Sequence, residues 1–249
     1  MSQYLLLCVY FPVAKQALAG TRGRERMQRR WEAARAFAAV RVHHPRARCL
    51  GAEAAFRAGE LLRGGGDLHV ALREFRVART RCLDGPFRAR AALEIGHVER
   101  RLGRAREALD AYQELFTDPH VPPSLRDAAM LWAGRVHADA GRFEEAWRLW
   151  ESVVTLAEDP VDRVQAFDLL ALALIERGDL EGAAGVLERC RVASSDVARE
   201  ETQLGVRVRN ALAQMRAVES LRKSVATRRA GVRIDRDDGE LASERREKK

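Results

Sequence analysis

The hydrophobic and polar positions of this 249-residue chain recur at a regular spacing, marked by Ala71, Ala108, Ala146 and Ala183. Each copy has a small residue, a glycine seven positions later, one of these alanines five positions after the glycine and a bulky apolar residue four positions further on. The small residues are Gly59, Gly96, Gly134 and Ala171. Apolar residues spaced by three and four on both sides of the glycine share one face of a helix. The pattern therefore predicts repeated pairs of helices, each pair joined by a tight turn at its glycine.

A helix pair of this length cannot bury its apolar stripe alone, so stacked neighbours must supply the core. We therefore predict an all-α fold, an α-solenoid of helix-turn-helix repeats. A fifth, partial copy precedes the four, because Ala33, Phe37 and Val40 repeat the spacing of the second helix one period before Ala71. The predicted array of four to five repeats spans residues 21–193.

The two ends of the chain do not follow the repeat. Residues 1–20 are rich in apolar side chains, which are interpreted as a signal peptide, a membrane anchor or a helix that caps the first repeat. Near the other end, the Ser-Ser-Asp sequence at 194–196 can cap a helix start, and an apolar stripe continues over 196–228. This predicts a long C-terminal capping helix at 194–230, whose stripe offers a surface for self-association. Residues 231–249 are mostly polar and charged, which predicts a disordered tail.

Basic charge is concentrated at one end of the chain. The formal net charge is +8, but residues 22–48 hold nine arginines against two glutamates, whereas residues 49–249 balance. A neutral array argues against nucleic acid bound along the whole solenoid. The segment 22–48 supports a second hypothesis, a peripheral membrane or nucleic-acid binder that uses these arginines. No run of about 18 apolar residues is present to span a bilayer.

The cysteines form no CxxC pair and have no partner at a metal-ligand spacing, so all four are expected to be free thiols. They are Cys8, Cys49, Cys82 and Cys190. Cys190 lies seven positions after Ala183, where the repeat places a small apolar residue. This position predicts core packing rather than chemistry.

No motif for catalysis or for a cofactor is found. The chain has no HExxH, no nucleophile–base arrangement and no dinucleotide fingerprint. Gly64–Gly66 is not followed by Lys and Ser or Thr, so it is interpreted as a helix-to-helix turn and not a phosphate loop. His43 and His44 lie beside Pro45 without a carboxylate or thiol at a useful spacing, so they are not expected to bind a metal. We therefore predict a protein that is not an enzyme and holds no metal or cofactor.

The third copy has a small residue, a histidine three positions later, then a glycine, an alanine, an aromatic residue and a small apolar residue. These residues are Gly134, His137, Gly141, Ala146, Trp150 and Val153. The pattern resembles the tetratricopeptide repeat, and with the weaker copies the resemblance covers roughly residues 28–193. The resemblance implies that the α-solenoid is right-handed. The period is longer than in that family, and the first-helix Trp is replaced, in this copy by Met130. The order and spacing of residue types in residues 33–75 are similar to those of bacterial envelope-associated proteins of the family.

In that family, partners lie in the concave groove lined by the first helix of each repeat. Carried over position by position, the resemblance implies a groove formed by Phe56, Arg63, Arg90, Leu93, His97, Arg100, Leu131 and Arg135. The arginines present forks suited to carboxylates, with the apolar side chains as pockets between them. Alternatively, these are ordinary solvated positions, partly paired with Glu53, Glu60 and Asp168. The Lys and Asn set with which some members grip a C-terminal carboxylate is absent.

The resemblance implies a non-enzymatic scaffold or adaptor that binds a peptide or helix of another protein, an acidic one if the arginines are used. The compartment is left open by the sequence. The cytoplasm is slightly favoured, and the bacterial envelope or periplasm is the alternative if residues 1–19 are a signal peptide.

Overall fold

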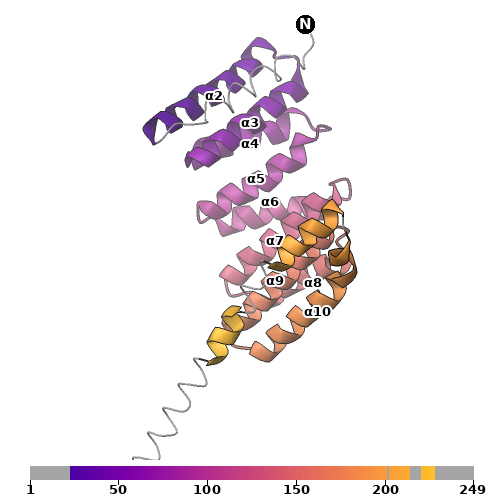
Figure 1. The fold of residues 1–249 in the computed structure, drawn as a ribbon. Coiled ribbons are helices and arrows are strands. Elements are labelled where there is room, and N and C mark those ends of the chain that lie inside the picture. The colour runs from indigo at the N-terminus through magenta and orange to yellow at the C-terminus, as the bar shows by residue number, and fades with distance from the viewer. Residues whose placement is uncertain (1–22, 201, 214–219, 228–249) are drawn as a thin grey trace, which may run out of the picture. The chain divides into compact units, whose positions relative to one another are not determined.

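The computed structural model describes residues 23–200, 202–213 and 220–227 (Figure 1). Every regular element within these residues is a helix. The main helices are α2 (Arg24–His43), α3 (Arg48–Gly65), α4 (Leu68–Arg81), α5 (Phe87–Arg101), α6 (Ala105–Thr117), α7 (Pro123–Asp139), α8 (Phe143–Leu156), α9 (Pro160–Arg177) and α10 (Leu180–Arg199). The predictions made for residues 1–20 and 231–249 lie outside the described residues.

The chain divides into two compact units, residues 1–136 and 137–249. In the described part of the first unit, α2 packs against α3, α3 against α4, α4 against α5 and α5 against α6. In the second unit, α8 packs against α9, and α9 packs against α10. Consecutive packing of helix pairs is how a solenoid buries its apolar stripes. The predicted all-α solenoid is confirmed, with α3, α5, α7 and α9 as the first helices of the repeats.

The repeated alanines lie where the period predicts, at the most buried positions of the second helices. Ala71, Ala108, Ala146 and Ala183 expose no surface. The bulky residue four positions later is fully buried in α4 and α6, where it is Phe75 and Tyr112. In the partial first copy, Phe37 and Val40 are buried in α2 as expected.

The small residues of the first helices make room for these bulky side chains. A Cβ atom placed on Gly59 would lie 2.6 Å from the ring of Phe75, and one placed on Gly96 would lie 2.3 Å from the ring of Tyr112. Real Cβ atoms do not approach other atoms this closely. The glycine and the aromatic ring of one repeat are therefore a matched pair.

The turn glycines end the first helices in the left-handed conformation. Gly66 has φ 94°, and its N–H donates to Arg63 O while Asp67 N–H donates to Leu62 O, which is the Schellman arrangement. Gly178 ends α9 in the same conformation, with φ 84°. Only glycine adopts this conformation without a steric cost, which is why the period preserves it.

The end of the last repeat differs from the prediction. Residues 194–196 do not start a helix, because α10 runs through them to Arg199. Ser194 is buried, and the Ser195 hydroxyl donates to Val192 O inside the helix instead of capping an N-terminus. Helical residues resume at 203–213 and 220–227, and the rest of the predicted 194–230 helix lies outside the described residues.

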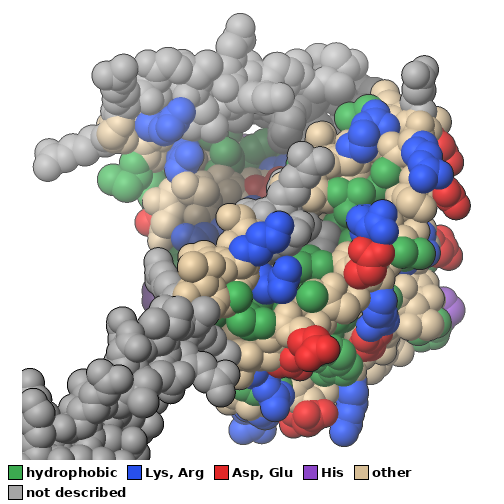
Figure 2. All heavy atoms as spheres, turned by 60° about the horizontal axis from the view of Figure 1, so that its bottom comes forward, with side chains coloured by type: hydrophobic (Ala, Val, Ile, Leu, Met, Phe, Trp, Pro, Cys, Tyr) green, Lys and Arg blue, Asp and Glu red, His purple; other side chains and the backbone are tan. Residues whose placement is uncertain are grey.

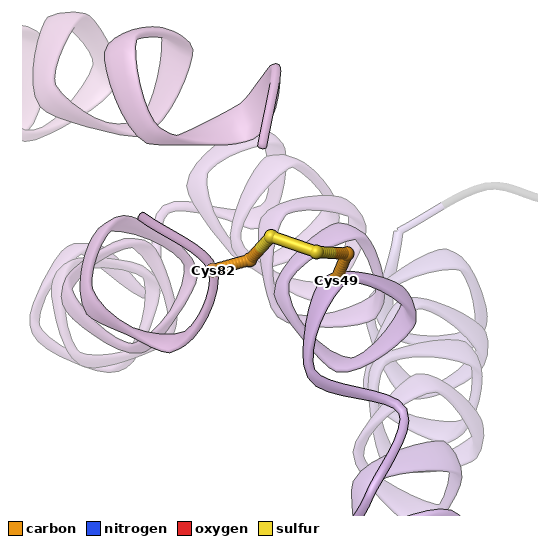
Figure 3. Close-up of a disulfide and its surroundings, with 2 residues drawn as sticks. All are labelled: Cys49 and Cys82. Atoms are coloured by element: carbon orange, nitrogen blue, oxygen red, sulfur yellow. A yellow bond between two sulfur atoms is a disulfide. The ribbon is translucent and has the colours of Figure 1, made fainter. Parts of the chain in front are cut away.

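Two of the four cysteines form a disulfide, so the expectation of free thiols is wrong for Cys49 and Cys82 (Figure 3). Cys49 lies in the first turn of α3 and Cys82 directly follows α4, with their Cα atoms 4.9 Å apart. The two helices form a hairpin, which brings the start of one to the end of the other. Cys190 is buried and forms no disulfide, as predicted, and Cys8 lies outside the described residues.

Candidate partner-binding face

The sequence-predicted site residues lie on α3, α5 and the part of α7 that belongs to the first unit. We call the side of these three helices that carries Arg63, His97, Arg100 and Arg135 the A-helix face. Exposure separates the predicted residues into two groups. Arg90 and Arg135 are exposed, whereas Phe56 and Leu131 are each only 5% exposed.

The predicted apolar pockets are filled by the protein itself. The ring of Phe56 lies 5.6 Å from that of Phe75 and 5.2 Å from that of Phe87, measured between centroids. Leu131 is buried to the same degree, and Leu93 is partly buried. These side chains pack against neighbouring helices, which removes them from solvent. They therefore form part of the core below the A-helix face and do not line open pockets on it.

Arg63 is neutralised within the protein. Its guanidinium lies 2.9 Å from a carboxylate oxygen of Glu94, across the junction of α3 and α5. Burial raises the pKa of the Glu94 carboxyl, although the Arg63 charge acts in the opposite direction. Arg63 is therefore paired within the protein, as one of the two alternatives proposed from the sequence holds. Its partner is Glu94 and not one of the acidic residues named there.

Arg100 and Arg135 share one aromatic ring. The Arg100 guanidinium carbon lies 4.7 Å from the centroid of Trp132, and that of Arg135 lies 5.1 Å from it. A guanidinium over an indole face is the strongest of the common cation–π pairs. Trp132 was missed in the sequence, although a signal was there: it occupies, one period later, the repeat position of Glu94.

His97 contacts both Tyr112 and Trp132. Its Nδ1 atom lies 2.8 Å from the Tyr112 hydroxyl in a hydrogen bond, and its ring meets Trp132 edge-on at 4.9 Å between centroids. Burial, with the nearby charges of Arg63 and Arg100, lowers the pKa of His97 to about 4. Burial also raises the pKa of Tyr112 above its ordinary value. Both groups are therefore uncharged at neutral pH.

We expect the imidazole of His97 to titrate with a midpoint near pH 4 in the folded protein, against 6.5 for an unperturbed histidine. Because the unfolded chain binds this proton first, stability from His97 is full above pH 6.5 and is lost as the pH falls toward 4. A ¹H–¹³C NMR titration of the histidine rings measures the midpoint.

The matched variant is His97→Gln, which keeps a side-chain hydrogen-bonding group but does not titrate. Its free energy of unfolding should fall less between pH 7 and pH 5 than that of the unchanged chain. Equal losses in the two proteins would show that His97 charges freely in the folded state.

Arg90 lies at the edge of the A-helix face, with its guanidinium carbon 5.9 Å from the centroid of Phe87. It also lines a pocket of about 710 Å³ formed by the α4–α5 and α6–α7 connections. Leu83 and Asp118 line the same pocket. This pocket could not be predicted from the repeat pattern, because the connections that form it lie outside that pattern.

Several arginines of the basic segment 22–48 make contacts within the protein. Arg41 forms an ion pair with Glu74, Arg29 lies 2.7 Å from a carboxylate oxygen of Glu25, and Arg30 donates to a backbone carbonyl at the end of α3. On the face drawn in Figure 2, basic and acidic side chains are interspersed. No helix in the part of the chain that the structure describes is long and apolar enough to cross a membrane. The internal contacts of these arginines do not favour the hypothesis of a membrane or nucleic-acid binder that uses them.

Within the described ranges, no group of three or more His, Cys, Asp or Glu side chains is arranged to hold a metal ion. The A-helix face carries arginines and aromatic rings. Such side chains are enriched where proteins bind one another.

No protein-family model matches the chain. No curated protein matches it either. Solved structures do match it, with a probability of 1.00 but at low sequence identity.

One match is a putative kinesin light chain of Podosopora anserina with nearly identical TPR-like repeats, at 18% identity and TM-score 0.58, covering 80% of this chain and 100% of the other. MamA matches at 16% identity and TM-score 0.56, covering 79% and 96%. PilW, a type IV pilus biogenesis factor, matches at 20% identity and TM-score 0.54, covering 86% and 89%. At these identities the likeness concerns the fold, and the fold of this chain is that of the tetratricopeptide-like repeat proteins.

Proposed function

We propose that this protein is a non-enzymatic scaffold that binds a peptide or helical segment of another protein on the A-helix face. The observation that carries the proposal is the cluster of arginines and aromatic rings on α5 and α7. These side chains are ordered by contacts with one another, yet the guanidinium groups of Arg100 and Arg135 have no acidic partner among the described residues.

Order before binding favours affinity. The Trp132 ring is in contact with His97 and with two guanidinium groups. The side chains of this face therefore lose little conformational entropy when a partner binds. Tryptophan and arginine are also the residue types that most often dominate the energy of protein interfaces. The tetratricopeptide-like fold agrees with such a role, since repeat arrays present extended surfaces.

The test is capture of partners by the full chain, compared with the double variant Arg90→Glu, Arg135→Glu. We expect the double variant to lose the partners that the unchanged chain captures, while its far-UV circular dichroism stays the same. Both side chains are exposed, so charge reversal alters the face without disturbing the core.

The matched control is Arg101→Glu, an exposed arginine at the end of α5 that contacts no aromatic ring in the described structure. This control should retain the partners. If the double variant captures the same partners with the same yield, the binding site lies elsewhere on the molecule.

A further inference from the structure

We propose that Arg100, Trp132 and Arg135 form a seat for one carboxylate, supplied by an aspartate or glutamate side chain of the bound segment. This inference rests on the proposed function and names the chemistry that the A-helix face recognises. Its centre is the ring of Trp132, with one guanidinium from the neighbouring helix α5 and one from its own helix α7.

The repeat itself indicates which group is missing. Arg63 and Arg100 occupy the same position in successive repeats, and Glu94 and Trp132 occupy another shared position. At the junction of α3 and α5, the arginine meets the carboxylate of Glu94 at 2.9 Å. At the junction of α5 and α7, the equivalent arginine meets an indole ring. The second junction therefore lacks the carboxylate that the first one carries.

The charges at the second junction are not balanced internally. Arg100 and Arg135 place two positive charges on one ring, and neither has a carboxylate partner within the described residues. His97 is uncharged at neutral pH and lies against the same ring. Like charges held on one ring repel each other, and a bound anion relieves the repulsion. Guanidinium groups bind carboxylates with paired, charge-assisted hydrogen bonds.

The Arg100 side chain is buried at the inner end of its guanidinium group. The Nε–H group of Arg100 is buried and has no hydrogen-bond acceptor in the described structure. Water is therefore excluded from this side of the guanidinium, and a carboxylate that binds its outer N–H groups meets a charge that is screened less than an exposed one. The seat is therefore partly desolvated, and we expect it to prefer a carboxylate over the neutral amide of the same shape.

The experiment starts from a displayed library of random short peptides selected on the full chain. The strongest binder is synthesised with a photo-crosslinker, together with variants in which each Asp or Glu is changed to its amide. We expect one acid-to-amide change to weaken binding about tenfold, the size of one charge-assisted hydrogen bond. We also expect crosslinks on α5 and α7.

The protein variants then locate the effect. Arg100→Gln with Arg135→Gln should bind the acidic peptide about tenfold more weakly and should no longer distinguish it from the amide. Trp132→Glu should have the same result, because it restores at this junction the carboxylate that Glu94 provides at the preceding one. Arg101→Gln, the matched control on α5, should bind like the unchanged chain, and circular dichroism should show equal helicity in all variants.

Failure of this inference and failure of the proposed function give different results. Crosslinks on the A-helix face with equal binding of acid and amide peptides would overturn the carboxylate seat alone. A full acid preference retained by the Arg100→Gln, Arg135→Gln variant would also overturn it. Crosslinks elsewhere, or a selection without any binder, would count against both the seat and the proposed function.

Discussion

Replacement of Cys49 and Cys82 by serine is expected to lower the free energy of unfolding by about 3–4 kcal/mol. The disulfide joins residues separated by 33 positions, and it closes one helix pair, α3 with α4. The cross-link removes much of the conformational freedom that this segment gains on unfolding. Because each repeat contacts only its neighbours, the loss should be concentrated in the N-terminal repeats.

Urea denaturation followed by circular dichroism measures this loss, and hydrogen exchange with mass spectrometry locates it. The control is a reductant added to both proteins. It should destabilise the unchanged chain by a similar amount and leave the serine variant unaffected. A serine variant as stable as the unchanged chain would mean that the cross-link contributes nothing to the folded state.

The cystine also bears on the compartment that the sequence left open. Disulfides persist in oxidising compartments and are rare in the cytosol. The pairing of Cys49 with Cys82 therefore favours an oxidising compartment over the cytosol, in contrast to the slight preference drawn from the sequence. Alkylation of the protein isolated under denaturing conditions should label both cysteines only after reduction.

The fold could be predicted from the sequence because the repeated residues are those that the packing of each helix pair requires. Ala71 and Ala108 recur at one spacing because only a small side chain fits where the helices of a repeat meet, and both expose no surface. Gly66 recurs because the turn requires a positive φ. These constraints are local and identical in each repeat, so the chain displays them several times.

The parts that were not predicted are those that occur once. The disulfide depends on the hairpin of α3 and α4, and a separation of 33 residues matches no local cysteine rule. The Ser-Ser-Asp sequence at 194–196 has the composition of a cap, but α10 continues through it and buries Ser194, so tertiary packing prevails. Trp132 stands at the repeat position where the preceding copy has Glu94, and the meaning of this difference became clear only beside the Arg63–Glu94 ion pair.

Truncation of Phe75 to alanine is expected to lower the free energy of unfolding by about 3–5 kcal/mol. This side chain exposes no surface, and its ring lies against Phe56 and against Gly59 of α3. Its removal leaves a cavity at the centre of the first complete repeat. Phe75→Leu should cost less than half as much, because leucine fills most of the space. Chemical denaturation of both variants tests the ranking, and equal costs would show that the ring is not what fills this site.

The pairing of Phe75 with Gly59 allows a sharper test. Gly59→Ala alone should cost about 1–3 kcal/mol, since its Cβ would lie 2.6 Å from the Phe75 ring. In the Phe75→Ala background the ring is absent, so the same change should instead stabilise α3 by about 0.5–1 kcal/mol through helix propensity. The control, Gly185→Ala in α10, has open space around it and should stabilise equally in both backgrounds. Additive effects of the Gly59 and Phe75 substitutions would show that the glycine recurs for a reason other than the ring it accommodates.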